Sequence, residues 1–214
     1  MSARARLLLL LLLAAAAPVS VAADYVVDAA HSRAAFSLRA LLVFGVDGWF
    51  DGVSGTLETD PATGTAQVEA WIDAASLHMH NPRYDAWARS AEFFDVERYP
   101  RIHFRSEPFP LDALQRGGAV TGRLTLHGFS GPVSLQLAPR DCVPLADADC
   151  PLQIHGAVSR SDFGMRAHRA TLSDTVRLDL AIVIRPVDGA APAAGAAPAA
   201  AGTAAQPAEA TSSG

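Results

Sequence analysis

Lysine is absent from this chain of 214 residues, so all 17 of its basic side chains are arginines. The arginines are spread along the sequence, and the formal net charge is −5. A protein that binds nucleic acid needs a clustered cationic surface to neutralise phosphates. The composition therefore argues against nucleic acid as a partner.

Cysteine is scarce as well, with only Cys142 and Cys150 in the stretch D-C-V-P-L-A-D-A-D-C-P. A metal or redox site would need a C-x-x-C spacing or a second ligand cluster, and neither is present. Two cysteines in one turn-rich loop of an exported chain favour a disulfide. In the chain-entropy model such a short loop gains about 2–3 kcal/mol from the bridge.

The sequence has no G-x-S-x-G nucleophile elbow, and Ser32 beside His31 is no triad because strand neighbours point to opposite faces. Acidic pairs such as Glu92 with Asp95 are more typical of a solvated face or a helix cap. We therefore predict no catalysis and no cofactor, and keep a barrel that uses His31 with Asp28 as the catalytic alternative.

Seven histidines raise the question of a metal site. A zinc site needs three or four convergent ligands, and no block of this sequence supplies them. We predict no metal site. The histidines are His31, His78, His80, His103, His127, His155 and His168.

The two ends of the chain differ from its middle. Arg4 and Arg6 precede an apolar run from Leu7 to Ala17 that would span only ~16 Å as a helix, about half a bilayer core. Small residues follow, so residues 1–23 are predicted to be a signal peptide for export to the periplasm or the medium. Residues 188–214 are rich in alanine and proline and are predicted to be disordered. Residues 24–187 have the size of one domain.

Alternation of apolar and polar residues dominates that domain and predicts half-buried strands. Close turn signals favour hairpins, and hence an all-β, antiparallel barrel of about eight strands. A β-sandwich has the same period and stays open. The alternating segments run through residues 33–39, 48–58, 67–73, 102–105, 120–127, 133–137, 154–158 and 176–184.

One segment breaks this period. Residues 83–90 follow Pro82 and read as a short helix that places Tyr84, Trp87 and Ala88 on one side. The helix leads directly into Phe93 and Phe94. We expect it near one mouth of the barrel, either as a lid or as a plug that fills the end of the core.

Four blocks of the sequence resemble the YceI family of secreted lipid-binding barrels, over roughly Tyr25 to Pro186. The resemblance implies a lipocalin-like barrel that carries a long isoprenoid or related amphiphile. The family often has a second histidine where this chain has Ala40, so the head group is left open. The blocks are D-A-A-H-S-R-A-A-F at 28–36, S-A-E-F-F-D-V-E-R-Y-P-R-I-H-F at 90–104, G-R-L-T-L-H-G-F-S-G-P-V-S-L at 122–135 and S-R-S-D-F-G-M at 159–165.

Apolar residues on the predicted inner phase, or at the mouth, are the candidate ligand-binding residues. They would favour a hydrocarbon chain at ~0.8 kcal/mol per buried methylene, although the same residues could fill a solid core. His31 either belongs to a polar cluster that closes the bottom of the barrel or helps to hold a polar head group. The candidates are His31, Phe36, Leu38, Phe50, Ile72, Trp87, Phe93, Phe104, Leu124 and Leu135.

We therefore predict an exported protein that binds or carries a polyisoprenoid-like lipid. Its partners would be an isoprenoid or another long-chain lipid, and a membrane protein is a further candidate. The alternative is a periplasmic stress or redox accessory protein in which the barrel holds a quinone for a membrane enzyme.

Overall fold

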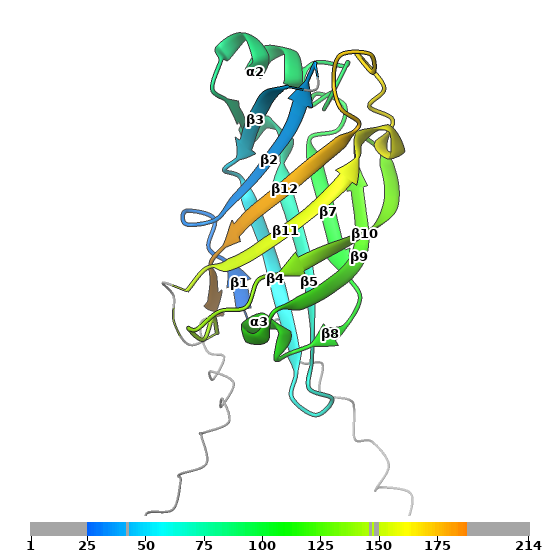
Figure 1. Cartoon of the computed structure of the whole chain (residues 1–214). Coiled ribbons are helices and arrows are strands. Elements are labelled where there is room, and N and C mark those ends of the chain that lie inside the picture. Colours follow the sequence, from blue (N-terminus) through cyan, green and yellow to red (C-terminus); the bar gives the residue numbers. More distant parts are fainter. Residues whose placement is uncertain (1–24, 42, 146, 148–149, 188–214) are drawn as a thin grey trace, which may run out of the picture.

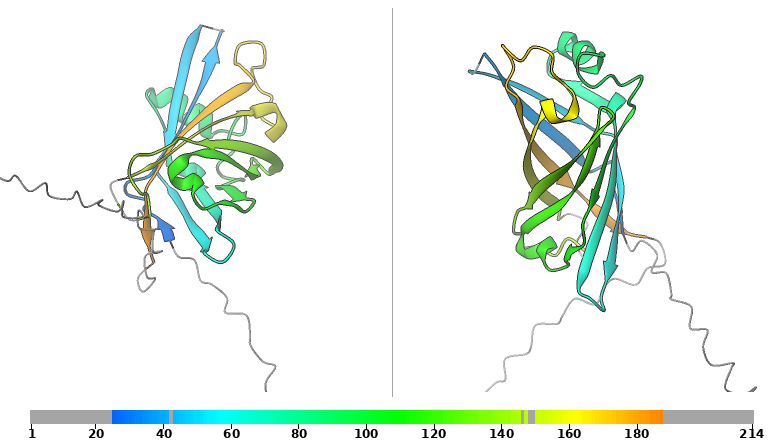
Figure 2. Two further views of the ribbon diagram at one scale, coloured as in Figure 1. Left: turned by 60° about the horizontal axis from the view of Figure 1, so that its bottom comes forward. Right: turned by 90° about the vertical axis from the view of Figure 1, so that its right-hand side faces the viewer.

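The computed structural model describes residues 25–187, apart from residues 42, 146 and 148–149. The predicted signal peptide and C-terminal tail lie outside the described residues. Within the described part, thirteen strands form one antiparallel sheet that curls into a barrel-like shape (Figures 1 and 2). The strands belong to one sheet, so the fold is not the two-sheet sandwich that the sequence also allowed.

The strands, in chain order, are β1 (Tyr25–Val27), β2 (Arg33–Ala40), β3 (Phe44–Phe50), β4 (Val53–Asp60), β5 (Thr65–Asp73), β6 (Leu77–Met79), β7 (Arg101–Ser106), β8 (Phe109–Pro110), β9 (Gly118–Leu126), β10 (Phe129–Leu137), β11 (Leu152–Ser159), β12 (Thr175–Ile182) and β13 (Ile184–Pro186). The helices are α2 (Pro82–Arg89) and α3 (Ala113–Arg116), with short 3-10 turns η1 (Ala74–Ser76) and η2 (Arg160–Phe163).

Among the strands that the structure describes, five pairs of neighbours are consecutive in the sequence, as hairpins require: β2–β3, β4–β5, β9–β10, β10–β11 and β11–β12. β2 pairs with both β3 and β12, while β1 pairs with both β4 and β13. At one end of the sheet order β1 lies between β13 and β4, and at the other end β2 lies between β12 and β3. The chain passes directly from β3 to β4 and from β12 to β13, so it connects these two ends twice. The sheet therefore curls around an interior that receives every second side chain.

The expected count of about eight strands was not confirmed, because several expected strands are interrupted. The strand predicted over residues 48–58 is divided at Asp51 and Gly52. There the Gly52 N–H donates to Ser76 Oγ at 2.8 Å, and a Cβ on Gly52 would lie 2.9 Å from Asp73 Cβ. The N–H is thus bonded to η1, and the sheet bends at this point.

The turn between the alternating segments 120–127 and 133–137 is shorter than their spacing suggests. Only His127 and Gly128 form it, with φ of 51° and 77°, and β10 begins at Phe129. Two central residues with positive φ are typical of a tight two-residue hairpin turn, so the remaining residues are free to pair with β9.

The predicted helix is confirmed as α2. Asn81 caps it by accepting the Arg83 N–H at 3.0 Å, and Pro82 occupies its first turn. Figure 1 places α2 at one end of the sheet. Among the described residues, none of the helices has the length and apolar character needed to cross a membrane.

The predicted disulfide is also present and joins Cys142 to Cys150 in the connection between β10 and β11.

Candidate functional site

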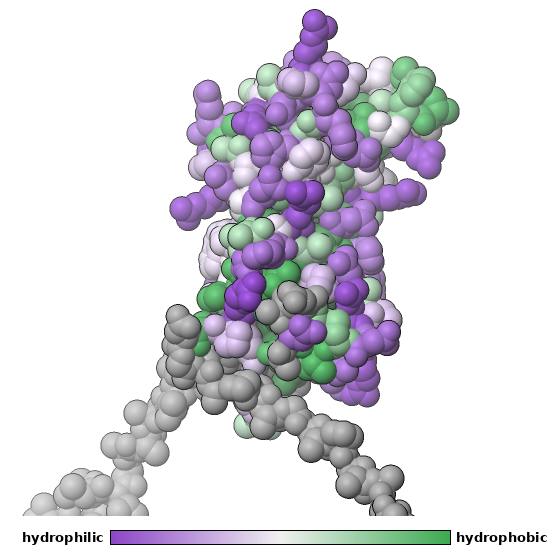
Figure 3. All heavy atoms as spheres, turned by 90° about the vertical axis from the view of Figure 1, so that its left-hand side faces the viewer, coloured by the Kyte–Doolittle hydropathy of each residue, from purple (hydrophilic) through white to green (hydrophobic). Residues whose placement is uncertain are grey.

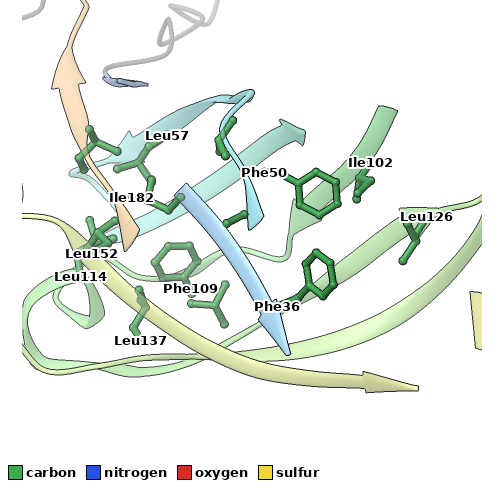
Figure 4. Close-up of a cluster of buried hydrophobic side chains, with 14 of the residues drawn as sticks. Phe36, Phe50, Leu57, Ile102, Phe109, Leu114, Leu126, Leu137, Leu152 and Ile182 are labelled. Carbon is green, nitrogen blue, oxygen red and sulfur yellow. The ribbon is translucent and has the colours of Figure 1, made fainter. Parts of the chain in front are cut away.

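An apolar cavity of about 210 Å³ lies inside the curled sheet. Its walls come mainly from strands all around the sheet and from the segment after α2, and they consist of apolar side chains with two exceptions, Thr56 and Arg160. Figure 4 shows Phe36, Phe50 and Ile102 projecting into the space between the strands. The interior is therefore neither filled completely nor polar.

Eight of the ten residues predicted to bind a ligand line this cavity, so they lie together as expected. Their role in binding stays a prediction. They are Phe36, Leu38, Phe50, Ile72, Phe93, Phe104, Leu124 and Leu135. Trp87 and His31 lie elsewhere.

Three phenylalanines gather inside the sheet. The ring centroid of Phe36 lies 5.6 Å from that of Phe50 and 5.9 Å from that of Phe94, and Phe50 and Phe94 are 5.3 Å apart. Tilted and edge-to-face pairs at these distances are favourable. Because Phe93 and Phe94 follow α2 closely in the chain, this aromatic cluster belongs to the α2 end of the cavity.

Glycines on neighbouring strands make room for the large rings. A Cβ on Gly48 would lie 2.5 Å from Phe36 Cζ, and a Cβ on Gly122 would lie 2.7 Å from Phe104 Cε2. Each ring therefore lies against the backbone of the adjacent strand rather than across the interior. This arrangement keeps the centre open although the lining residues are bulky.

Arg160 is the one charged residue of the lining, and only 2% of it is exposed. Its guanidinium donates to four backbone carbonyls of the connection between η2 and β12, so the charge is fully engaged in holding that connection. Burial lowers the pKa of this arginine, and the Asp174 carboxylate opposes the shift. The acceptors are Met165 (2.9 Å), Ala167 (2.6 Å), Leu172 (3.4 Å) and Ser173 (3.0 Å).

Trp87 takes part in a contact that joins the α2 end to the loop before β12. Its indole N–H donates to Glu92 Oε2 at 2.7 Å, and His168 Nε2 lies 3.1 Å from the same oxygen. The hydrogen bond from Trp87 and then that from His168 lower the pKa of Glu92. The Trp87 ring packs edge-on against Phe93 at 4.6 Å. Trp87 thus supports the covering segment from outside the cavity.

His31 lies on the turn between β1 and β2 with 64% of its side chain exposed. Its Nδ1 is 2.9 Å from the Asp28 carboxylate, which also accepts a hydrogen bond from Arg185. That bond from Arg185 is the main reason why the pKa of Asp28 falls to about 2. Because His31 is absent from the cavity lining, its position favours the polar-cluster interpretation over head-group binding.

The neighbouring Ser32 explains what this cluster does for the fold. Its buried hydroxyl accepts the Val183 N–H at 3.0 Å and lies 3.3 Å from the Val183 carbonyl, which also accepts the Asp28 N–H at 2.8 Å. Val183 is the residue at which β12 breaks into β13. Residues of the D-A-A-H-S block therefore form hydrogen bonds with the backbone N–H and carbonyl of Val183, where the strand is interrupted.

Three further histidines each lie beside a different carboxylate. His78 lies 3.2 Å from Asp51, His103 lies 3.0 Å from Glu69, and His155 lies 2.8 Å from Asp179. Within residues 25–187, apart from the gaps named above, no three histidine, cysteine or acidic side chains are grouped as metal ligands would be.

Sequence reasoning missed several residues of the site. Phe94 and Phe109 line the cavity, yet neither was among the candidates. Phe94 follows Phe93 outside any alternating segment, and Phe109 lies on the two-residue strand β8, so neither had a strand phase that could be read. The role of the glycines beside the large rings could be recognised only from the pairing of the strands, which the sequence does not give.

Comparison with known proteins agrees with this architecture. A family model described as the YceI-like domain matches residues 25–184. Protein YceI of Escherichia coli O157:H7 is 27% identical over 168 residues, which cover 76% of this chain and 87% of that protein.

Two solved structures share the fold. Burkholderia cenocepacia BcnA has a TM-score of 0.62 at 22% identity, and covers 74% of this chain and 98% of its own. A polyisoprenoid binding domain from Saccharophagus degradans, implicated in plant cell wall breakdown, has a TM-score of 0.58 at 18% identity, over 78% of this chain and all of its own. At these identities the likeness concerns the fold alone. With the family model spanning almost the whole described region, the chain is a member of the YceI-like domain family.

Proposed function

We propose that this protein binds a polyisoprenoid-like lipid in the cavity and carries it outside the cytoplasm, without catalysing a reaction. The observation that carries the proposal is the cavity itself, whose walls are apolar apart from Thr56 and the engaged Arg160. Each methylene moved from water into such a space gains ~0.8 kcal/mol. The name of the Saccharophagus degradans structure, a polyisoprenoid binding domain, supports the same ligand class.

The lining also bears on where the polar end of the ligand lies. The Arg160 guanidinium already donates to four carbonyls, so a head group drawn inside would lose its hydration without finding a partner. We expect the head group to stay at the mouth and the hydrocarbon chain to occupy the interior.

The size of the cavity adds a condition. Small-molecule sites commonly measure ~300–1,000 Å³, more than the 210 Å³ found here. A long chain therefore requires the cavity to widen. Rotation of Phe93 and Phe94, which belong to the segment held by Glu92 and His168, is the change that we expect to accompany binding.

Titration with a fluorescent polyprenyl analogue tests this proposal. We expect saturable binding that unlabelled polyprenyl lipid displaces and that a short-chain alcohol does not. A bound ubiquinone-type quinone that polyprenyl lipid cannot displace would favour the role of a redox accessory. Absence of binding by any long-chain isoprenoid would refute both functions.

A further inference from the structure

The tip of the hairpin between β2 and β3 exposes large apolar side chains. Leu41, Val43 and Phe44 are 59%, 71% and 62% exposed. Figure 3 shows an apolar projection, coloured green, at the upper right of the molecule, at the end where this hairpin lies. Hairpin tips usually carry glycine, asparagine or aspartate. Three large apolar residues exposed together indicate a surface that meets an apolar partner.

The backbone of this tip is held in place. The Leu41 N–H donates to the Thr171 carbonyl at 2.7 Å, and the Ser173 N–H donates to the Arg39 carbonyl at 2.8 Å. Leu41 has a φ of 48°, a conformation that favours glycine or asparagine over leucine. Turn formation alone does not require a leucine at this position. A non-glycine residue with positive φ is strained, and such strain is typical of functional sites.

Positive charge surrounds the tip, although the whole chain carries −5. Exposed arginines outnumber aspartates in the half of the hairpin near the tip, in the loop hydrogen-bonded to it and in the first residues of β12. The arginines are Arg39 on the hairpin, Arg166 and Arg169 in the loop and Arg177 on β12, and the aspartates are Asp47 and Asp174.

A depression of about 360 Å³ adjoins the tip on the outer face of β2, β3 and β12. Val43 forms part of its wall. Two arginines, Arg39 and Arg177, line it with one carboxylate, Asp47, and three hydroxyl groups. The two arginines outnumber the single carboxylate, and guanidinium groups suit the oxygens of a phosphate. The Ser173 hydroxyl is already engaged, because it donates to the Thr175 carbonyl at 3.0 Å. The hydroxyl residues are Ser37, Ser173 and Thr175.

We propose that the β2–β3 tip inserts into the interfacial layer of an anionic phospholipid bilayer and that the adjoining depression receives lipid phosphates. Apolar side chains gain by leaving water, and the arginines are attracted by the negative surface potential of the membrane. A second copy of the chain is the poorer partner, because it would bring the same arginines together. The proposal does not depend on what the cavity binds.

Vesicle flotation of the full chain tests the apolar part of this surface. Wild type is expected to float with phosphatidylglycerol-containing vesicles and not with phosphatidylcholine vesicles, and added salt should weaken the binding. The double change Val43→Ser and Phe44→Ser should reduce binding at least tenfold. Val143→Ser is the matched control, because Val143 is 43% exposed in the loop between β10 and β11 and should leave binding unchanged. Any contribution of residues 1–23 is common to all variants.

Single charge changes test the polar part. Arg177→Gln should weaken binding about fivefold, whereas Arg123→Gln, also at an exposed position but on β9, should have no effect. Phe44→Trp should become quenched by brominated lipids in anionic vesicles, and this readout decides the question if the serine variant fails to fold.

Failure of wild type to float with anionic vesicles, or unchanged flotation of the folded serine variant, would overturn the proposal. It would also be overturned if sedimentation showed a dimer that the serine changes dissociate, since the tip would then contact a second copy. Polyprenyl binding by the same variants should be unchanged, which separates this proposal from the function of the cavity.

Discussion

Replacing Phe104 by alanine distinguishes a cavity wall from a solid core. Phe104 is only partly buried although it faces inward, whereas Ile102 on the same strand and phase is 7% exposed. One side of the Phe104 ring borders the cavity, so the ring has fewer packing contacts to lose. We expect the free energy of unfolding of the lipid-free protein to fall by about 1–2 kcal/mol, below the ~3–5 kcal/mol usual for a fully packed phenylalanine.

Phe163 provides the matched control. It is 2% exposed and does not belong to the cavity lining, so Phe163→Ala should cost ~3–5 kcal/mol. The two losses are measured by denaturant unfolding of lipid-free protein. Affinity for a fluorescent polyprenyl analogue should fall about tenfold in Phe104→Ala, equivalent to ~1.4 kcal/mol of lost contact, and should be unchanged in folded Phe163→Ala. Equal stability losses with unchanged binding by Phe104→Ala would refute the reasoning.

Three further changes test other parts of the account. Gly122→Val should displace both the Arg105 carbonyl, which the added Cβ would meet most closely, and the Phe104 ring, and should therefore weaken polyprenyl binding and cost ~3 kcal/mol or more in unfolding free energy. Unchanged binding would contradict the role given to this glycine. Because the hydrogen bond from Arg185 lowers the pKa of Asp28 to about 2, Asp28 stabilises the fold above pH ~4 and loses this effect as pH falls towards 2. Asp28→Asn should flatten that part of a pH titration of thermal stability, and an unaltered acid limb would be evidence against it. Leu124→Glu should abolish lipid binding, because an unpaired carboxylate would enter the apolar space. Retained lipid in that variant would place the ligand elsewhere.

The fold could be predicted largely because the period of two survives along most strands. Phe36, Leu124 and Leu135 all lie on the inner face, as the alternation indicates. The interruptions could not be predicted, since they depend on distant contacts. β12 ends at Ile182, and the backbone of the next residue, Val183, is hydrogen-bonded by Ser32, which is far away in the sequence.

The site was predictable to a similar extent and failed where a side chain acts through a tertiary contact. Trp87 carries the apolar area of a ligand-binding residue, but its indole N–H is directed to Glu92 outside the cavity. Arg160 reads as a surface arginine in the sequence, although it is buried against four carbonyls of a loop. Val43 and Phe44 lie between the alternating segments 33–39 and 48–58, and nothing in the sequence predicted that these apolar side chains would be exposed.

Native mass spectrometry of protein purified from its own host, followed by extraction and identification of the bound lipid, tests the central claim most directly. The apolar cavity predicts that wild type retains a polyprenyl chain and that Leu124→Glu does not. Wild-type protein that is recovered without any long-chain isoprenoid, and that takes none up when one is supplied, would contradict the account.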